Sequence, residues 1–155
     1  MPTYNNLELK IDLDENKGFL LEKIKNKKIL VIGGAGSIGF SYIKEILEYK
    51  PSKITIVDIN ENGLTELTRD LRSSNLLDYD PKYITYPVNL LSSTFDKIFH
   101  SDSWDVVANF SAHKHVRSEK DGISVEALIK NNVFGIIKLL ELCDKSPPNY
   151  FFSVS

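Results

Sequence analysis

The sequence contains very little cysteine and lacks long apolar runs. Cys143 is the one cysteine among 155 residues, so the chain cannot close an internal disulfide, and its composition suits a reducing compartment. No run of about 18 consecutive apolar residues occurs, and no basic segment followed by an apolar one is found, so neither a membrane span nor a secretion signal is expected. We therefore expect a cytoplasmic protein without a membrane segment.

The chain also lacks an excess of charge of either sign. It carries 19 Lys and Arg against 21 Asp and Glu, which gives a formal net charge of −2 at pH 7. This balance gives no electrostatic support for a nucleic-acid partner, because such binding depends on neutralising phosphates. A hydrophobic content of 42% and a charged content of 26% are ordinary for a globular chain, so one domain with a substantial core is expected.

Four of the eight glycines lie between residues 33 and 39, where a strand-like run passes directly into a helix-like one. The segment matches the spacing Gly34-x-Gly36-x-x-Gly39, and also a shifted form that begins at Gly33. In such turns the first glycine permits a tight exit from the strand, the second lets a backbone N–H approach a pyrophosphate, and the third lets helix pack on strand. The spacing predicts a phosphate-binding turn, although the same glycines also suit a ligand-free turn.

Two further features of a dinucleotide site follow the turn. Ser37 and Ile38 are expected in the first helical turn, where unpaired N–H groups and the positive end of the helix dipole favour an anion. Asp58 ends the next apolar run 19 residues after Gly39, close to the roughly 20 expected for an acid that binds the adenosine ribose. A carboxylate repels a 2′-phosphate, and the next arginine is Arg69, so NAD is favoured over NADP unless a lysine elsewhere serves that phosphate.

Hydrophobic periodicity divides the chain into alternating strands and helices. Residues 1–27 are interpreted as an N-terminal extension with a short helix, and residues 28–155 as a dinucleotide-binding domain. The expected strands are 28–32, 53–58, 83–88, 105–110 and 150–154, and the expected helices are 38–49, 61–72, 93–100 and 124–144. The expected N-caps are Asn60, Ser92 or Ser93, and Ser124. The last helix is predicted to face the sheet through six apolar residues, Leu128, Ile129, Val133, Ile136, Ile137 and Leu140.

This alternation predicts a doubly wound α/β fold. Strands joined through helices by short connections form a parallel sheet with right-handed crossovers, and the expected strand order is 3-2-1-4-5, as in a Rossmann domain. In such a sheet a ligand lies beyond the carboxyl ends of the strands, where the strand order reverses. The segments that follow Ile32, Asp58, Val88 and Phe110 are therefore expected to converge on one site.

A second cluster of polar residues follows the fourth predicted strand, over residues 109–117. His113 and His115 are spaced as a metal pair can be, but no cysteine or third histidine is at hand to complete a metal site. An ordinary solvated basic loop is another interpretation. Because the segment leaves a strand that ends at the expected ligand crevice, its position favours a binding role.

Three segments resemble the extended short-chain dehydrogenase/reductase superfamily, and within it the nucleotide-sugar 4,6-dehydratases and epimerases of bacterial polysaccharide biosynthesis. They are residues 31–39 with the glycine-rich turn, residues 105–116 with the specific element Lys114-His115-Val116, and residues 126–135 in the following helix. The likeness extends over about residues 20–155. It implies a Rossmann domain that binds a nicotinamide dinucleotide and serves the conversion of a nucleotide sugar.

The resemblance also implies roles for individual residues. Those implied to line the dinucleotide site are Gly33, Gly36, Ser37, Ile38, Gly39, Asp58, Asn89, Leu90, Ser111, Ala112 and Lys114. His115 is implied either to face the sugar substrate or to be a packed structural histidine, and no metal is expected. The positions that depart from the family pattern leave the substrate open, and they are Ile32 for Thr, Asn89 for Asp, Asn109 for His and Arg117 for Pro.

The acid–base pair of the superfamily, Tyr-x-x-x-Lys, has no usable counterpart in this sequence. Its one match, Tyr49 to Lys53, is interrupted by Pro51 and a predicted strand, so the two side chains cannot share a helix face. The variant with Met for Tyr fails because Met1 is the one methionine. In the family these elements follow the fifth strand, so we expect the truncated N-terminal portion of such an enzyme, inactive by itself. The alternative is a stand-alone, non-catalytic dinucleotide-binding module, and homo-oligomerisation is left open.

Overall fold

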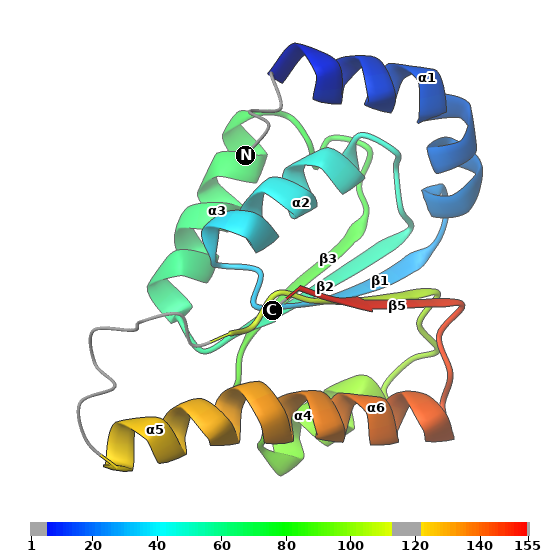
Figure 1. Cartoon of the computed structure of the whole chain (residues 1–155). Helices are drawn as coiled ribbons and strands as arrows, with labels where there is room; N and C mark the ends of the chain where they lie inside the picture. Colours follow the sequence, from blue (N-terminus) through cyan, green and yellow to red (C-terminus); the bar gives the residue numbers. More distant parts are fainter. Residues whose placement is uncertain (1–5, 113–121, 155) are drawn as a thin grey trace.

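The computed structural model describes residues 6–112 and 122–154, which form a doubly wound α/β fold (Figure 1). Five strands form one parallel sheet in the order β3-β2-β1-β4-β5, which confirms the predicted topology. The strands are β1 (Lys28–Ile32), β2 (Lys53–Asp58), β3 (Lys82–Pro87), β4 (Val106–Asn109) and β5 (Tyr150–Ser153). Their limits agree with the predicted ones to within about one residue.

Helices cover both faces of the sheet (Figure 1). On one face lie α2 (Ser37–Leu47) and α3 (Glu61–Ser73), and on the other lie α4 (Ser93–Phe99), α5 (Gly122–Ile129) and α6 (Gly135–Lys145). A π-helical turn, η1 (Lys130–Phe134), joins α5 to α6. The N-terminal helix α1 (Asn6–Ile24) lies on the same side of the sheet as α2, and its 19 residues make it longer than the short helix expected from the sequence.

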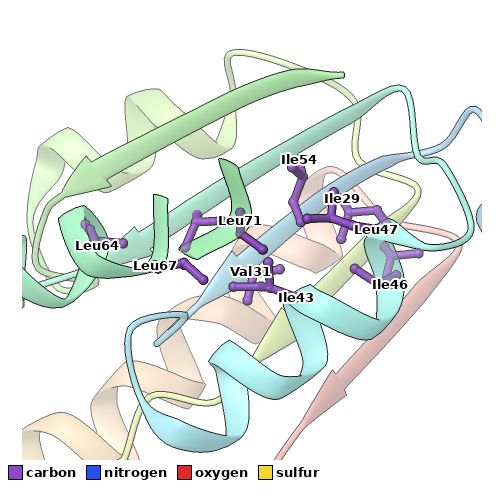
Figure 2. Packing of buried hydrophobic residues seen from close by; sticks show 11 residues of the cluster. Ile29, Val31, Ile43, Ile46, Leu47, Ile54, Leu64, Leu67 and Leu71 are labelled. Carbon is purple, nitrogen blue, oxygen red and sulfur yellow. The ribbon is translucent and has the colours of Figure 1, made fainter. Parts of the chain in front are cut away.

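The core has two layers because β1 and β2 are buried on both faces. Ile29 and Val31 of β1 point towards α2 and α3, where they pack in one apolar cluster with residues such as Ile43 and Leu67 (Figure 2). Leu30 and Ile32 point to the opposite face and pack with the residues of α4 and α6. Continuous apolar runs are typical of parallel strands that are covered by helices on both sides.

Two predicted helix starts are confirmed. Asn60 caps α3, where its Oδ1 accepts a hydrogen bond of 3.0 Å from the Gly63 N–H. Ser92 caps α4, where its Oγ accepts a bond of 3.3 Å from the Phe95 N–H. Such caps satisfy N–H groups that have no partner within the helix.

The prediction for the last helix is partly wrong. The helix begins at Gly122, before Ser124, and η1 interrupts its regular turns. Its buried residues are Gly135, Leu139 and Leu142, whereas four of the residues expected to face the sheet are 42–51% exposed, namely Ile129, Val133, Ile137 and Leu140. The cause is that apolar residues occupy most sides of this helix, and the π-helical turn shifts the later residues around the axis.

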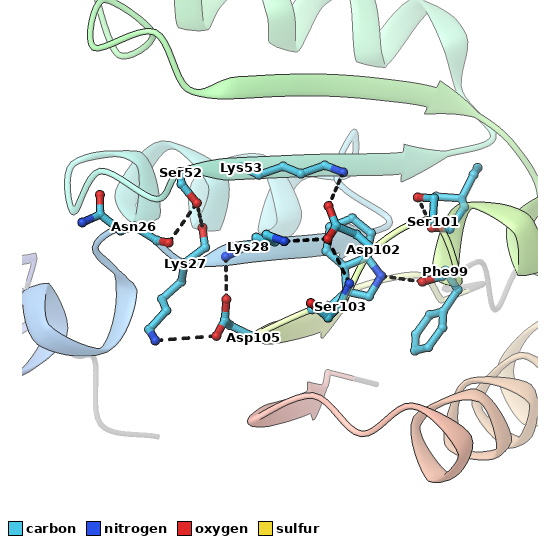
Figure 3. A network of polar contacts seen from close by, with 12 residues as sticks. Asn26, Lys27, Lys28, Ser52, Lys53, Phe99, Ser101, Asp102, Ser103 and Asp105 are labelled. Atoms are coloured by element: carbon cyan, nitrogen blue, oxygen red, sulfur yellow. Dashed lines mark hydrogen bonds and ion pairs between the residues drawn. The ribbon is translucent and has the colours of Figure 1, made fainter.

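A polar network joins the strands at the end of the sheet opposite to their carboxyl ends (Figure 3). Asp102 accepts hydrogen bonds from Lys28 Nζ at 2.7 Å and Lys53 Nζ at 2.8 Å, and the Lys53 ammonium also lies 4.9 Å from the centre of the Trp104 ring. The hydrogen bonds from Lys28 and Lys53 hold the pKa of Asp102 well below its usual range. The Lys53 side chain is only 9% exposed, so its charge depends on this partner.

Replacing Asp102 by Asn is expected to lower the free energy of unfolding by about 2 kcal/mol at pH 7, because buried Lys53 loses its counter-charge. Asp102 titrates lower in the folded than in the unfolded chain, so its stabilising effect is present above the unfolded pKa of about 4 and is lost as the pH falls below it. Urea unfolding of the wild type and of Asp102→Asn at pH 7 and pH 3 measures the free energy of unfolding of each protein. The difference between the two proteins should be smaller at pH 3.

The control for this change is Asp70→Asn, which removes a carboxylate from an ion pair with Lys44 whose two side chains are 41% and 42% exposed. Exposed ion pairs contribute little, so this variant should lie within about 0.5 kcal/mol of wild type. Equal losses for the two variants, or a pH-independent loss for Asp102→Asn, would contradict the role given to the network.

Candidate functional site

A cleft of about 360 Å³ lies at the carboxyl ends of the strands. The segments that follow β1, β2, β3 and β4 all contribute to it, which is the convergence that the sequence predicts. Its lining residues are Ile32, Gly33, Ala35, Gly36, Val57, Asp58, Ile59, Asn60, Val88, Asn89, Leu90, Phe110, Ser111, Ala112 and Asn131. In a doubly wound sheet this is the position where ligands bind.

The first glycine of the turn is required by the protein itself. Gly33 has a φ of +75°, and its N–H donates to the Val57 carbonyl at 2.8 Å. A Cβ at this position would lie 2.5 Å from the Ser111 backbone nitrogen and 2.7 Å from the Phe110 carbonyl carbon. The turn therefore packs directly against the segment after β4, which leaves no space for a side chain.

The other glycines of the turn divide into packing and open positions. A Cβ on Gly34 would overlap the Ile56 side chain, and one on Gly39 would overlap the Gly33 carbonyl oxygen. Gly36 differs, because it has an ordinary extended conformation with φ −74° and ψ 158°, and a Cβ would meet nothing closer than the Gly33 oxygen at 3.5 Å. No neighbouring atom of the described chain requires glycine at position 36, which lines the cleft.

Helix α2 begins beside this open position. Gly36 is its N-cap and has no side chain to accept a hydrogen bond from the first turn. Ser37, Ile38 and Gly39 are the first three helical residues, and they lie beside the cleft at the helix start rather than among its lining residues. The N–H groups of a first helical turn have no acceptors within the helix, so this end offers hydrogen-bond donors and a partial positive charge to an anion.

Asp58 is held in place at the end of β2. Its Oδ2 accepts a hydrogen bond from the Ala35 N–H at 2.9 Å, and its Oδ1 accepts one from the Asn60 N–H at 2.9 Å. Each carboxylate oxygen still has a lone pair, so the group can accept two further hydrogen bonds. The carboxylate thus joins the glycine-rich turn to the start of α3 and offers acceptors to hydroxyl groups in the cleft.

A family model described as "Polysaccharide biosynthesis protein" matches residues 29–155. This chain belongs to that polysaccharide biosynthesis family. It is 32% identical over 131 residues to the uncharacterized membrane protein MJ1061 of Methanocaldococcus jannaschii, a match that covers 84% of this chain and 36% of the relative. It is 31% identical over 121 residues to the dTDP-glucose 4,6-dehydratase of Salmonella typhimurium, which covers 76% of this chain and 31% of that enzyme.

A similar fold occurs in solved structures. The enzyme WbmF of Bordetella bronchiseptica, solved in complex with NAD+ and UDP, matches with a TM-score of 0.63 and 18% identity, over 84% of this chain and 36% of that one. The chain spans between 22% and 36% of the length of four curated relatives that it matches. Within residues 6–112 and 122–154, no helix combines the length and apolar character needed to cross a membrane.

In this member of the polysaccharide biosynthesis family, the turn after β3 carries two of the residues implied to bind the dinucleotide. The Asn89 Oδ1 accepts a hydrogen bond from the Leu91 N–H at 2.8 Å. The Asn89 carbonyl oxygen accepts a second bond, of 2.7 Å, from the Ser92 hydroxyl. Leu90 is 6% exposed and packs in the core below the cleft. Asn89 therefore shapes the turn, and Leu90 supplies an apolar floor.

Seven of the residues implied by the resemblance line this one cleft, namely Gly33, Gly36, Asp58, Asn89, Leu90, Ser111 and Ala112. Lys114 and the proposed substrate residue His115 lie outside the residues that the structure describes. The same holds for His113, so the metal-pair alternative is not addressed by the structure. Among the described residues, no three His, Cys, Asp or Glu side chains are grouped as a metal site.

Sequence reasoning missed several cleft residues of this family member. Ala35 and Asn60 both contact Asp58 through their N–H groups, and the identification of Asn60 as a helix cap placed it only indirectly near the site. Asn131 lines the cleft from η1. Its position depends on the π-helical turn, for which the sequence has no dependable signal, whereas π-helical turns are frequent at functional sites.

Proposed function

We propose that this chain is the NAD-binding N-terminal portion of a nucleotide-sugar 4,6-dehydratase or epimerase of polysaccharide biosynthesis. Its family membership and the cleft at the strand ends support the proposal. The observation that carries it is Gly36, a glycine that the protein's own packing does not require, located at an uncapped helix start and lining the cleft beside Asp58. An open backbone at a helix start is suited to a close-lying pyrophosphate.

The residues of the cleft fit the parts of a dinucleotide in order. The start of α2 would bind the pyrophosphate, Asp58 would accept hydrogen bonds from the adenosine ribose, and the turn with Asn89 and Leu90 would border the adenine. The segment with Ser111 and Ala112 lies across β1 from Asp58, on the side where the nicotinamide half would lie. The bound nicotinamide would supply the acceptance and return of a hydride.

The preference for NAD over NADP is proposed on the basis of charge. Asp58 would repel a 2′-phosphate next to the ribose hydroxyls that it binds. Arg69 and Arg72 of α3 line a separate groove next to β3, so within the described residues they do not offer that phosphate a counter-charge in the cleft. Lys114 is proposed to hold a ribose hydroxyl or a phosphate, and His115 to face the sugar substrate.

Replacing Asp58 by Ala is expected to weaken NAD binding and to narrow the preference for NAD over NADP by about tenfold, because both the acceptor oxygens and the repulsive charge are removed. Titration calorimetry with each dinucleotide measures the two affinities. Asp70→Asn is a suitable control, since it removes the same charge from α3 outside the cleft. Tighter binding of NADP than NAD by the wild type, or an unchanged preference in Asp58→Ala, would refute the assignment.

The catalytic part of the proposed reaction needs a positioned acid and base. The 155 residues contain no usable Tyr-x-x-x-Lys or Met-x-x-x-Lys, so we propose that the cofactor is bound here and that the proton-transferring groups are supplied by further residues of a longer protein. A stand-alone, non-catalytic binding module is the alternative. A longer gene product that converts UDP-sugars in the presence of NAD would favour the proposal that this chain is part of a longer enzyme. A cytoplasmic location and a homo-oligomeric state stay predictions.

A further inference from the structure

Asn109, the last residue of β4, has a buried amide at the edge of the cleft. It is 4% exposed and ends the strand. Its Oδ1 accepts two hydrogen bonds from Ser111, one from the backbone N–H at 3.1 Å and one from Oγ at 2.6 Å. Its Nδ2 donates a third, of 3.0 Å, to Ser153 Oγ at the end of β5. All three polar partners therefore belong to the segments that border the strand ends.

The direction of these bonds follows from the chemistry of the groups. A backbone N–H can only donate, so the Asn109 atom that faces the Ser111 N–H must be the amide oxygen. The Ser111 hydroxyl reaches the same oxygen and must therefore give it its single proton. Ser111 Oγ then has only its lone pairs left for a further hydrogen bond, and Ser111 lines the cleft. The Ser111 hydroxyl can therefore act only as a hydrogen-bond acceptor towards a ligand.

We infer that Ser111 Oγ accepts a hydrogen bond from a hydroxyl or amide N–H on the nicotinamide half of the dinucleotide, and that Asn109 is the positioning residue that sets this polarity. The inference rests on the proposed dinucleotide binding. Ser111 follows β4, on the opposite side of β1 from Asp58 at the end of β2. A phosphate oxygen is not a suitable partner, because at neutral pH it too is an acceptor. The donors available on that half are the ribose hydroxyls and the carboxamide.

Ser111→Ala tests the contact directly, because it removes the hydroxyl and leaves the backbone N–H bond to Asn109 in place. Titration calorimetry with NAD, ADP-ribose and ADP separates the parts of the ligand. We expect NAD to bind about two- to tenfold more weakly to the variant, the value of one hydrogen bond, and ADP to bind unchanged. A matching loss with ADP-ribose identifies a ribose hydroxyl as the donor, and a loss with NAD alone identifies the carboxamide.

Substitutions of Asn109 test the positioning role. Asn109→Asp keeps an acceptor for both Ser111 groups, and the Ser153 hydroxyl can turn to donate to it, so this variant should bind NAD like wild type. Asn109→Leu removes the acceptor and should weaken NAD binding at least as much as Ser111→Ala, while ADP affinity stays within about twofold. Ser153→Ala is the matched control. It removes only the hydrogen bond that Asn109 Nδ2 donates and leaves those between Asn109 Oδ1 and Ser111, so NAD affinity should be unchanged.

The outcomes separate this inference from the proposed function. If wild type binds NAD and Ser111→Ala binds it equally well, the inference is overturned and the proposed function stands. Equal losses of NAD and ADP affinity in Ser111→Ala would also overturn it, because the residue would then act on the whole cleft. If wild type binds no NAD at all, the proposed function fails, and the inference fails with it. Thermal melts of every variant check that the fold is retained.

Discussion

Gly36→Val is expected to abolish dinucleotide binding and to leave the fold intact. The two methyl groups of valine would occupy the space over the start of α2 that the pyrophosphate needs. We expect NAD affinity to fall by roughly 100-fold or more. The backbone of Gly36, with φ −74° and ψ 158°, lies in a region that valine favours, so the free energy of unfolding should change by no more than about 1 kcal/mol.

Calorimetry with NAD and urea unfolding of the same protein measure the two effects of Gly36→Val separately. Gly18→Val is the matched control, because Gly18 lies in α1 and does not line the cleft, and no neighbouring atom of the described residues lies within 4 Å of the position that a Cβ would take. This control should bind NAD like wild type. If Gly36→Val loses its cooperative unfolding together with its affinity, Gly36 has a structural role and the main observation behind the proposed function is lost.

Gly33→Ala, unlike Gly36→Val, is expected to prevent stable folding. The new Cβ would lie 2.5 Å from the Ser111 nitrogen and 2.7 Å from the Phe110 carbonyl carbon, and both are backbone atoms. They cannot move aside easily, because the Phe110 N–H donates to the Ile32 carbonyl at 2.8 Å. The positive φ of +75° adds a cost of about 1 kcal/mol for any L-residue. We expect a total loss of about 4 kcal/mol or more, a large part of the stability of a small domain.

Urea unfolding followed by far-UV dichroism measures this loss for Gly33→Ala. The matched comparison is Gly36→Ala, which adds the same methyl group three residues later, where the nearest atom among residues 6–112 and 122–154 is 3.5 Å away. We expect Gly36→Ala to stay within about 1 kcal/mol of wild type. Similar stabilities for the two alanine variants would mean that the turn does not pack against the segment after β4 as described.

Much of the fold was predictable because its signals are local. Residues 29–32 are all apolar, residues 54–57 are apolar apart from Thr55, and such strands need helices on both faces. Asn60 and the spacing of Leu64, Leu67 and Leu71 predict the start and the buried face of α3, and the structure agrees with both. These predictions hold because a cap or a one-sided pattern depends only on residues within one or two turns.

The errors occurred where local signals were ambiguous. The helix after residue 122 is apolar on most sides, so periodicity did not identify Leu139 and Leu142 as the buried pair. The inserted π-helical turn, which brings Asn131 to the cleft, has no clear signature in the sequence. Only packing against β4 and α4 decides which side of such a helix is buried.

By itself the sequence determined the strand order, the glycine-rich turn and the acid at the end of β2, since each depends on composition and spacing along the chain. Only the tertiary structure decided that Gly33 is required by the protein while Gly36 is open to a ligand, and that Asn109 sets the Ser111 hydroxyl as an acceptor. The physical reason is that the free space and the hydrogen-bond partners at these positions come from segments distant in sequence, which folding brings together at one edge of the sheet.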